Sequence, residues 1–212
     1  MSNFMLTPLS NEIQELAHGL GLRTILFQER DFLFYKGDNK KELDQLITKS
    51  YKLKVPLICS PTSEVFLRHV IEKTPVHYIT GIEFIHPNDS LHQVRGGLDQ
   101  VLAPLLHQKQ KEIIFSFAEI LHSHNRAKLL ARVRFNLMLC HKYNVDVCFT
   151  TFGTTKSDLR SLKDMQMFWK LLGGRNEEVG FFRLCRKSHI DKSPHQDILM
   201  GAGWRVKLHH ES

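Results

Sequence analysis

Residues 112–117 of this 212-residue chain read Glu-Ile-Ile-Phe-Ser-Phe, and the fold class follows from them. The run is apolar on both faces of the predicted strand. This is expected for a strand of a parallel sheet, because helices cover both faces of such a sheet. Helices are predicted on either side of it, over residues 96–108 and 125–143. A buried strand between two helices is the repeating unit of an α/β fold.

The same alternation of short apolar runs and amphipathic segments extends outward along the chain. Further strands are predicted at residues 4–6, 23–27, 55–59, 77–84 and 145–150. Further helices are predicted at residues 9–20, 38–50, 62–73 and 157–172, with Asp38, Thr62 or Ser63, and Ser157 as caps and Gly173 as a stop.

At least five strand–helix units in this length predict a TIM-like (β/α) barrel near the short end of its size range. A doubly wound open sheet is the alternative, and periodicity does not separate the two. No repeat, low-complexity tract or long linker divides the sequence, so residues 1–212 are predicted to form a single barrel domain.

The composition is that of a globular protein, with 42% hydrophobic and 24% charged residues. The four cysteines form no C-x-x-C pair, so the sequence indicates neither a disulfide framework nor a zinc ribbon. No apolar run approaches the ~18 residues of a membrane span, and no secretory signal pattern stands at the N-terminus. We therefore expect a cytoplasmic protein.

Positive charge is concentrated in the second half of the chain. Residues 1–106 carry 11 Lys and Arg against 12 Asp and Glu, whereas residues 107–212 carry 18 against 10, within an overall charge of +7. Such a distribution favours an anionic partner, with a plain solubility role as the alternative.

Two loops after predicted strands carry candidate anion contacts. Arg95 precedes Gly96 and Gly97 at a helix start, which suits a phosphate oxygen, although the glycines alone could serve a tight turn. Residues 150–160 hold hydroxyls, a glycine, Lys156 and Arg160, which suit a polyanion, although Arg160 could pair with an acid on its own helix.

Other patterns give weaker signals. Thirteen histidines include His122-Ser-His124 and His209-His210, but the first strand lacks the H-x-H or acidic partner of a metal phosphoesterase, so no metal site is predicted. Nucleophile-elbow, Walker and dinucleotide motifs are absent. Four basic residues on the 125–143 helix form either a solvated face or an RNA track: Arg126, Lys128, Arg132 and Arg134.

Two stretches resemble the ribonuclease P protein component 3 family. The first is residues 95–117, RGGLDQVLAPLLHQKQKEIIFSF, with an Arg, a Gly-Leu-Asp segment, an Ala-Leu helix and a strand. The second is residues 129–173, with Lys142-Tyr143 before a strand, Asp158-Leu-Arg160 and a closing Leu-Leu-Gly. Residues 193–199 are similar to the family's last helix, whereas residues 150–153, Thr-Thr-Phe-Gly, depart from its Ser-Gly-Ala-like turn.

The resemblance implies a barrel related to the polymerase-and-histidinol-phosphatase barrels but without their metal site. It also implies a subunit of ribonuclease P, the ribonucleoprotein that removes the 5′ leader from precursor tRNA. In that family the RNA and its magnesium ions perform the hydrolysis. The implied partners are ribonuclease P RNA, precursor tRNA, protein component 2 and the other protein subunits, and no cofactor is expected on this chain itself.

Folding a catalytic RNA crowds its phosphates, and cationic side chains lower that repulsion. We therefore hypothesise that five basic residues contact RNA or an acidic partner surface: Arg95, Arg126, Lys156, Arg160 and Arg175. No catalytic and no metal-binding residue is predicted. The alternative function is a stand-alone metal-dependent phosphoesterase on the same barrel.

Overall fold

The computed structural model describes residues 2–7, 11–22, 24–89 and 94–180. Two parallel sheets are present in these ranges. The first pairs β1 (Ser2–Met5) with β2 (Thr24–Phe27). The second has five strands: β3 (Leu33–Gly37), β4 (Leu57–Pro61), β5 (Tyr78–Thr80), β6 (Glu112–Ser116) and β7 (Asp146–Thr150).

The strand order bears on the choice between the two predicted architectures. The large sheet runs β3-β4-β5-β6-β7, in chain order, and all its neighbours are parallel. A doubly wound sheet reverses its order at a switch point, whereas sequential order is that of a (β/α) barrel. The α/β prediction is thus confirmed, and the doubly wound alternative is wrong for the described sheet.

The two sheets also touch one another. The Leu6 N–H donates to the Gly153 carbonyl at 2.8 Å, and Met5 and Gly153 form an isolated parallel bridge. This contact places β1 beside the segment that follows β7. The arrangement is consistent with a TIM-like barrel.

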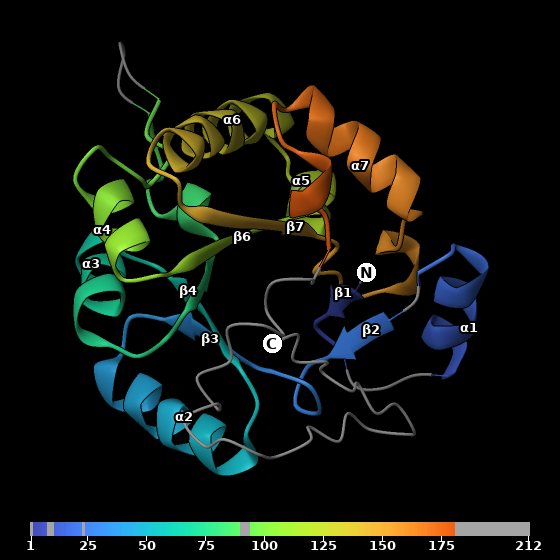
Figure 1. Cartoon of the computed structure of the whole chain (residues 1–212), viewed down its shortest axis with the longest axis horizontal. Helices are drawn as coiled ribbons and strands as arrows, with labels where there is room; N and C mark the ends of the chain where they lie inside the picture. Colours follow the sequence, from blue (N-terminus) through green and yellow to red (C-terminus); the bar gives the residue numbers. More distant parts are fainter. Residues whose placement is uncertain (1, 8–10, 23, 90–93, 181–212) are drawn as a thin grey trace, which may run out of the picture.

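Helices surround the strands. They are α1 (Asn11–Gly19), α2 (Lys40–Leu53), α3 (Glu64–Lys73), α4 (Leu102–Gln108), α5 (Phe117–His122), α6 (Arg126–Lys142) and α7 (Leu162–Leu171). Figure 1 shows α1 to α4, α6 and α7 around the rim with the strands inside. Three short 3₁₀ helices follow strands or helices: η1 (Ile82–Phe84), η2 (Lys156–Asp158) and η3 (Asn176–Glu178). Among the described helices, none is long and apolar enough to cross a membrane.

Side-chain caps explain where several helices begin. The Ser63 hydroxyl accepts the Phe66 N–H at 3.3 Å, as predicted for α3, and the Asn125 amide oxygen caps α6. The caps of two other helices are corrections to the prediction. Asn39, not Asp38, caps α2, and Ser161, not Ser157, caps α7, because residues 156–158 form η2 instead.

Four further differences separate the structure from the prediction. β3 and the short α5 are not predicted from the sequence, and the predicted strand over residues 77–84 is divided into β5 and η1. The helix predicted from residue 96 begins only at Leu102, because residues 96–98 lie against α6. The helix predicted at residues 193–199 lies outside the described residues.

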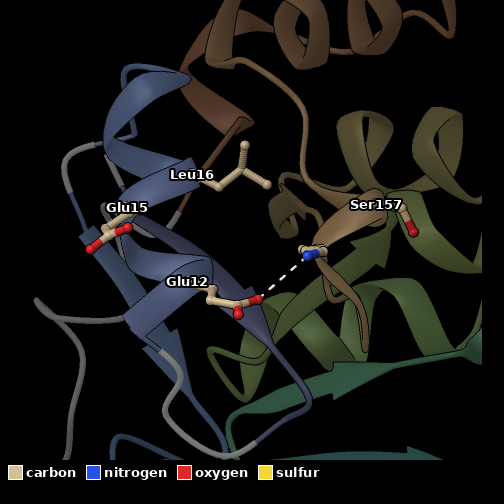
Figure 2. Close-up of a pocket in the computed structure, with 5 residues that line it drawn as sticks. Glu12, Glu15, Leu16 and Ser157 are labelled. Carbon is tan, nitrogen blue, oxygen red and sulfur yellow. Dashed lines mark hydrogen bonds and ion pairs between the residues drawn. The ribbon is translucent and has the colours of Figure 1, made fainter.

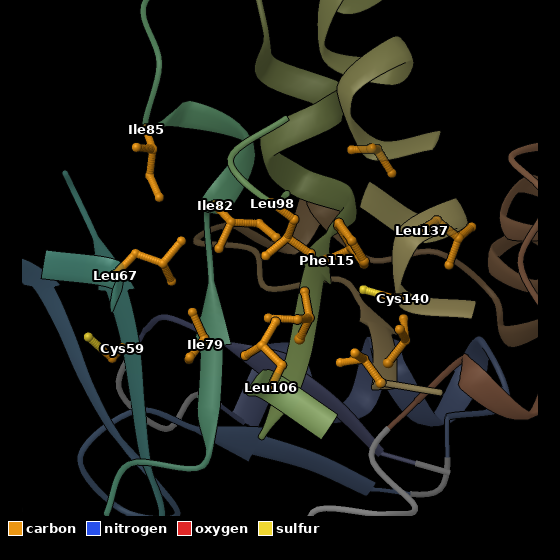
Figure 3. Close-up of a cluster of buried hydrophobic side chains, with 14 of the residues drawn as sticks. Cys59, Leu67, Ile79, Ile82, Ile85, Leu98, Leu106, Phe115, Leu137 and Cys140 are labelled. Atoms are coloured by element: carbon orange, nitrogen blue, oxygen red, sulfur yellow. The ribbon is translucent and has the colours of Figure 1, made fainter. Parts of the chain in front are cut away.

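The core on the large sheet has two layers, one on each face, and a third cluster packs α1 against β1 and β2. The outer layer joins strands to helices, and Figure 3 shows Ile79 and Phe115 of the strands beside Leu67, Leu106 and Leu137 of the helices. The inner layer collects the alternate strand residues from both sheets, together with two phenylalanines: Leu26, Phe32, Ile58, Tyr78, Ile114, Cys148 and Phe152. Full burial of one such large apolar side chain stabilises the fold by about 1.5–3 kcal/mol.

Gly97 lies close to the backbone of η1, and this close approach depends on its being a glycine. Its φ is +98°, a left-handed conformation that residues with a Cβ rarely adopt. A Cβ at this position would also clash with the Ile82 carbonyl oxygen, which belongs to the backbone. Both the backbone conformation and the available space therefore require glycine.

Replacing Gly97 tests this close approach. Gly97→Ala should lower the free energy of unfolding by at least about 2 kcal/mol in urea denaturation, because a strained backbone and a clash are introduced together. Gly19→Ala in α1 is the matched control, because a Cβ there would meet nothing within 4 Å. It should leave stability unchanged or raise it by up to about 1 kcal/mol. Equal losses in both variants would contradict the requirement for glycine at residue 97.

Candidate functional site

On the inner face of the large sheet, polar side chains lie at the carboxyl ends of the strands. Because side chains alternate along a strand, the residue two positions after an inner-layer residue lies on the same face. The residues so placed are all polar and stand at the carboxyl ends of β3 to β7: Lys36, Ser60, Thr80, Ser116 and Thr150. Ligands of parallel α/β folds bind at these ends of the strands.

Two carboxyl groups stand just beyond this row. Glu83 lies in η1 after β5 and is 1% exposed, and Glu119 lies in the first turn of α5 after β6. Burial, followed by the neighbouring Glu119 carboxyl, raises the pKa of Glu83 to about 8. Burial also raises the pKa of Glu119, against the opposing effect of Lys36. The three groups therefore interact across the strand ends.

The segment after β5 is fastened to α6 by a buried arginine. The Arg132 guanidinium donates to the carbonyls of Glu83 at 2.8 Å and His86 at 2.6 Å, and it forms an ion pair with Asp89 at 2.8 Å. The predictions of a solvated face or an RNA track are therefore both wrong for Arg132. Its spacing of three from Leu129 places it on the buried stripe of α6, a signal that the sequence contained.

A second α6 side chain holds the continuation of that segment. Asn136 is fully buried, donates to the Gly96 carbonyl at 2.6 Å and accepts the Leu98 N–H at 3.4 Å. A Cβ on Gly96 would clash with the Asn136 amide oxygen. Both glycines beside Arg95 are thus required by packing. The Arg95 side chain itself is exposed, and the backbone N–H of Arg95 donates to the Asp89 carboxylate at 2.9 Å.

Replacing Arg132 tests this attachment. Arg132→Met should lower the free energy of unfolding by about 3–5 kcal/mol, because it removes one partner of a buried ion pair and leaves two carbonyls without their donor. Arg134→Met is the matched control, since Arg134 is exposed on the same helix, and it should change stability by no more than about 0.5 kcal/mol. Chemical denaturation of both variants measures the difference, and a small effect of Arg132→Met would show that the attachment is dispensable.

The segment after β7 is organised around Asp158. This fully buried carboxylate accepts the N–H groups of Thr154 and Thr155 at 3.0 and 2.9 Å, and the His122 imidazole lies 2.6 Å away. Burial alone would raise the pKa of Asp158, but the hydrogen bonds from Thr155 and His122 outweigh it and hold the pKa below its usual value.

The departure from the family's turn at residues 150–153 has a local reason. Phe152 adopts a φ of +49° and packs in the inner layer, with its ring centroid 6.0 Å from Phe32 and 5.5 Å from Phe34. A Cβ on Gly153 would lie 2.5 Å from the Asp158 Cβ. The turn is therefore shaped by an aromatic side chain that fills the inner layer.

Asp158→Asn tests the role of this carboxylate. The substitution should cost about 1–3 kcal/mol at pH 7, because charged hydrogen bonds are replaced by weaker ones and a buried donor replaces an acceptor. A lowered folded-state pKa means that the carboxylate stabilises the fold above the unfolded pKa and that this contribution is lost as the pH falls through the folded value. The stability gap between wild type and variant, from urea titrations, should accordingly shrink below about pH 4. A gap that stays constant down to about pH 2 would contradict this role.

The basic residues predicted as contacts fall into two groups. Arg95, Arg126, Lys156 and Arg160 follow β5, β6 or β7 and lie on the carboxyl-end side of the sheet. Arg175 follows α7, which returns to the opposite end, and there its N–H donates to Glu178 at 2.9 Å. The structure therefore brings four of the five to one side.

Three of these side chains already have partners within the chain. The Lys156 ammonium lies 3.4 Å from Glu12 of α1, the contact drawn as a dashed line in Figure 2. The Arg126 guanidinium donates to the Leu121 carbonyl at 2.7 Å, and Arg160 donates to the Ser157 carbonyl at 2.7 Å. Arg160 also lies over the Phe117 ring at 5.6 Å. Because Arg160 stands between η2 and α7 and not on a helix, the predicted pairing with an acid on its own helix is wrong.

Another cation of the second half is buried. Lys111, just before β6, is 3% exposed and donates to the carbonyls of Thr74 and Val76. Burial, followed by nearby Lys109, lowers the pKa of Lys111 to about 8. Lys111 is thus a structural residue at the amino ends of the strands.

Metal-ligand groupings are sparse in the part of the chain that the structure describes. No group of three or more His, Cys, Asp and Glu side chains there could hold a metal ion. Cys59, Cys140 and Cys148 are buried in the core outside any disulfide, and burial raises the pKa of Cys59 to about 12. None of the three is therefore a reactive nucleophile.

Fold and site together define a parallel α/β protein whose strands end in polar residues, with several basic side chains on the same side. No protein-family model matches the chain. Over 202 residues the chain is 24% identical to Ribonuclease P protein component 3 of Methanococcus vannielii, covering 87% of this chain and 81% of the relative. The resemblance to the ribonuclease P protein component 3 family is thereby confirmed.

A solved structure supports the fold. A chain in the cryo-EM structure of archaeal Ribonuclease P with mature tRNA superposes with a TM-score of 0.57 at 20% identity, over 81% of this chain and 72% of that chain. An uncharacterized protein of known crystal structure matches more weakly, with a TM-score of 0.46 and 11% identity over 66% of this chain and 34% of the other. The first match shows that the two chains share a fold.

Proposed function

We propose that this chain is a protein subunit of ribonuclease P, which removes the 5′ leader from precursor tRNA. The observation that carries the proposal is the similarity to a ribonuclease P protein component 3 along most of both chains. The α/β fold shared with a chain of archaeal ribonuclease P supports it. The proposed partners are ribonuclease P RNA, precursor tRNA, protein component 2 and the other subunits.

The division of labour is part of the proposal. The RNA and its magnesium ions would perform phosphodiester hydrolysis, and this chain would contribute shape and positive charge without being catalytic itself. The proposed barrel spans residues 1–212 as one domain with its strands closed into a ring, and the proposed location is the cytoplasm. A stand-alone metal-dependent phosphoesterase is not favoured, because the relative is a ribonuclease P component.

The basic strand-end residues would act by lowering phosphate repulsion. Arg95, Arg126, Lys156 and Arg160 share the carboxyl-end side, and the Lys156 side chain is 66% exposed. Arg175, at the opposite end, would reach a different contact, either RNA or an acidic partner surface. Each neutralised phosphate releases condensed counterions, so these contacts would weaken as salt rises.

Pull-down of the tagged chain followed by sequencing of bound RNA tests the proposal directly. One structured RNA recovered together with precursor tRNA is the expected result. The purified chain alone should leave a generic phosphate ester intact when manganese is added. Recovery of no defined RNA, or hydrolysis by the chain alone, would overturn the proposed function.

A reconstituted particle tests the role of the basic side chains. Lys156→Glu with Arg160→Glu should raise the magnesium concentration needed for half-maximal cleavage of precursor tRNA, because two phosphate-screening charges are reversed. Lys49→Glu with Lys52→Glu on α2 is the matched control and should leave that concentration unchanged. Circular dichroism confirms that both double variants fold. An unchanged magnesium requirement in the first variant would rule out these contacts.

A further inference from the structure

The two carboxyl groups at the strand ends have polar atoms without partners among the described residues. Both carboxylate oxygens of Glu83 and one of Glu119 are inaccessible to solvent and make no hydrogen bond there. The same is true of the Thr80 hydroxyl, whose residue is 2% exposed. Buried polar groups are almost always satisfied, so such a gathering indicates a missing ligand.

These groups occupy one place in the fold. Thr80 lies on the inner face of β5, two residues after Tyr78 of the inner layer. Glu83 follows it in η1, and Glu119 opens α5 directly after β6, the strand paired with β5. Lys36, at the end of β3, lowers the pKa of Glu119 against the larger effect of burial.

If both members of the pair are ionised, they need a counter-charge. A buried carboxylate without compensation costs several kcal/mol, and two adjacent ones repel each other as well. Of the influences on the pKa of Glu83, the lowering by Arg132 is the smallest. The Arg132 guanidinium is bound to two carbonyls and to Asp89. Lys36 lowers the pKa of Glu119, whereas burial and the Glu119 carboxyl keep the pKa of Glu83 raised despite Arg132.

We propose that Glu83 and Glu119 bind one divalent metal cation of the magnesium class, with the Thr80 hydroxyl beside it and water completing its coordination. The available donors are all oxygen, which suits hard cations and not zinc or copper. Magnesium in proteins usually takes one or two carboxylates and keeps several waters. Glu83 is almost completely buried, so a small ion reaches its carboxylate more readily than a Lys or Arg side chain of a partner does.

Such a cation would join η1 to the start of α5 and so fix the carboxyl ends of β5 and β6 relative to each other. In its absence the pair avoids double ionisation, as the raised pKa of Glu83 indicates. The site departs from the sequence-based expectation that this chain holds no metal. It does not depend on the proposed function, because a structural cation needs no RNA.

Manganese is the probe, because Mn²⁺ replaces Mg²⁺ at oxygen sites and its electron paramagnetic resonance signal reports the free ion. The full chain, first treated with a chelator, should bind about one Mn²⁺, and millimolar Mg²⁺ should displace it. Glu83→Gln with Glu119→Gln should weaken Mn²⁺ binding by at least about tenfold, since two coordinating charges are removed. Glu15→Gln with Glu177→Gln, two exposed acids elsewhere, is the matched control and should bind as wild type does.

Three outcomes would overturn the cation site. They are no bound Mn²⁺ in the wild type at millimolar concentration, full binding in the Glu83/Glu119 variant, and an equal loss in the control. The first would mean that a proton or a cationic side chain neutralises the pair. If the double variant does not fold, Glu119→Gln alone serves, because Glu119 is partly exposed. Phosphate-ester hydrolysis by the manganese-loaded chain would instead overturn the proposed function and leave the cation site standing.

Discussion

The attachment of the segment after β5 to α6 is the interaction on which the strand-end side of the molecule depends. One guanidinium, that of Arg132, holds two carbonyls and a carboxylate that span residues 83–89. This attachment positions Glu83 directly, because Arg132 donates to its carbonyl. It positions the backbone of Arg95 through Asp89, which accepts the Arg95 N–H. Asp158 does the same for the segment after β7, so each segment is shaped by a buried charge with several partners.

Much of the fold could be predicted because its apolar pattern is strong. The runs that form β4, β6 and β7 are continuous, and α6 shows a regular stripe from Leu129 to Cys140. β3 could not be predicted in the same way, since Leu33-Phe-Tyr-Lys-Gly37 mixes polar and apolar residues and follows β2 closely. The late start of α4 has no signal in its own sequence, because it results from a distant amide, that of Asn136.

The candidate site was only partly predictable for a related reason. Basic residues are visible as charge, and four of those chosen lie on one side because their loops follow neighbouring parallel strands. Glu83 and Glu119 are ordinary acids in the sequence, and only the strand pairing of β5 with β6 brings them together. A usable signal did exist in the hydroxyl residues Ser60, Thr80, Ser116 and Thr150, each at the end of an apolar run.

The burial of two cations changes what the basic half of the chain presents to its surroundings. Residues 107–180 contain 12 Lys and Arg against 7 Asp and Glu, but Arg132 and Lys111 direct their charges at internal carbonyls. A formal count is therefore an upper bound on the surface potential that a polyanion meets at long range. Retention on a cation exchanger would follow the smaller, exposed set of charges.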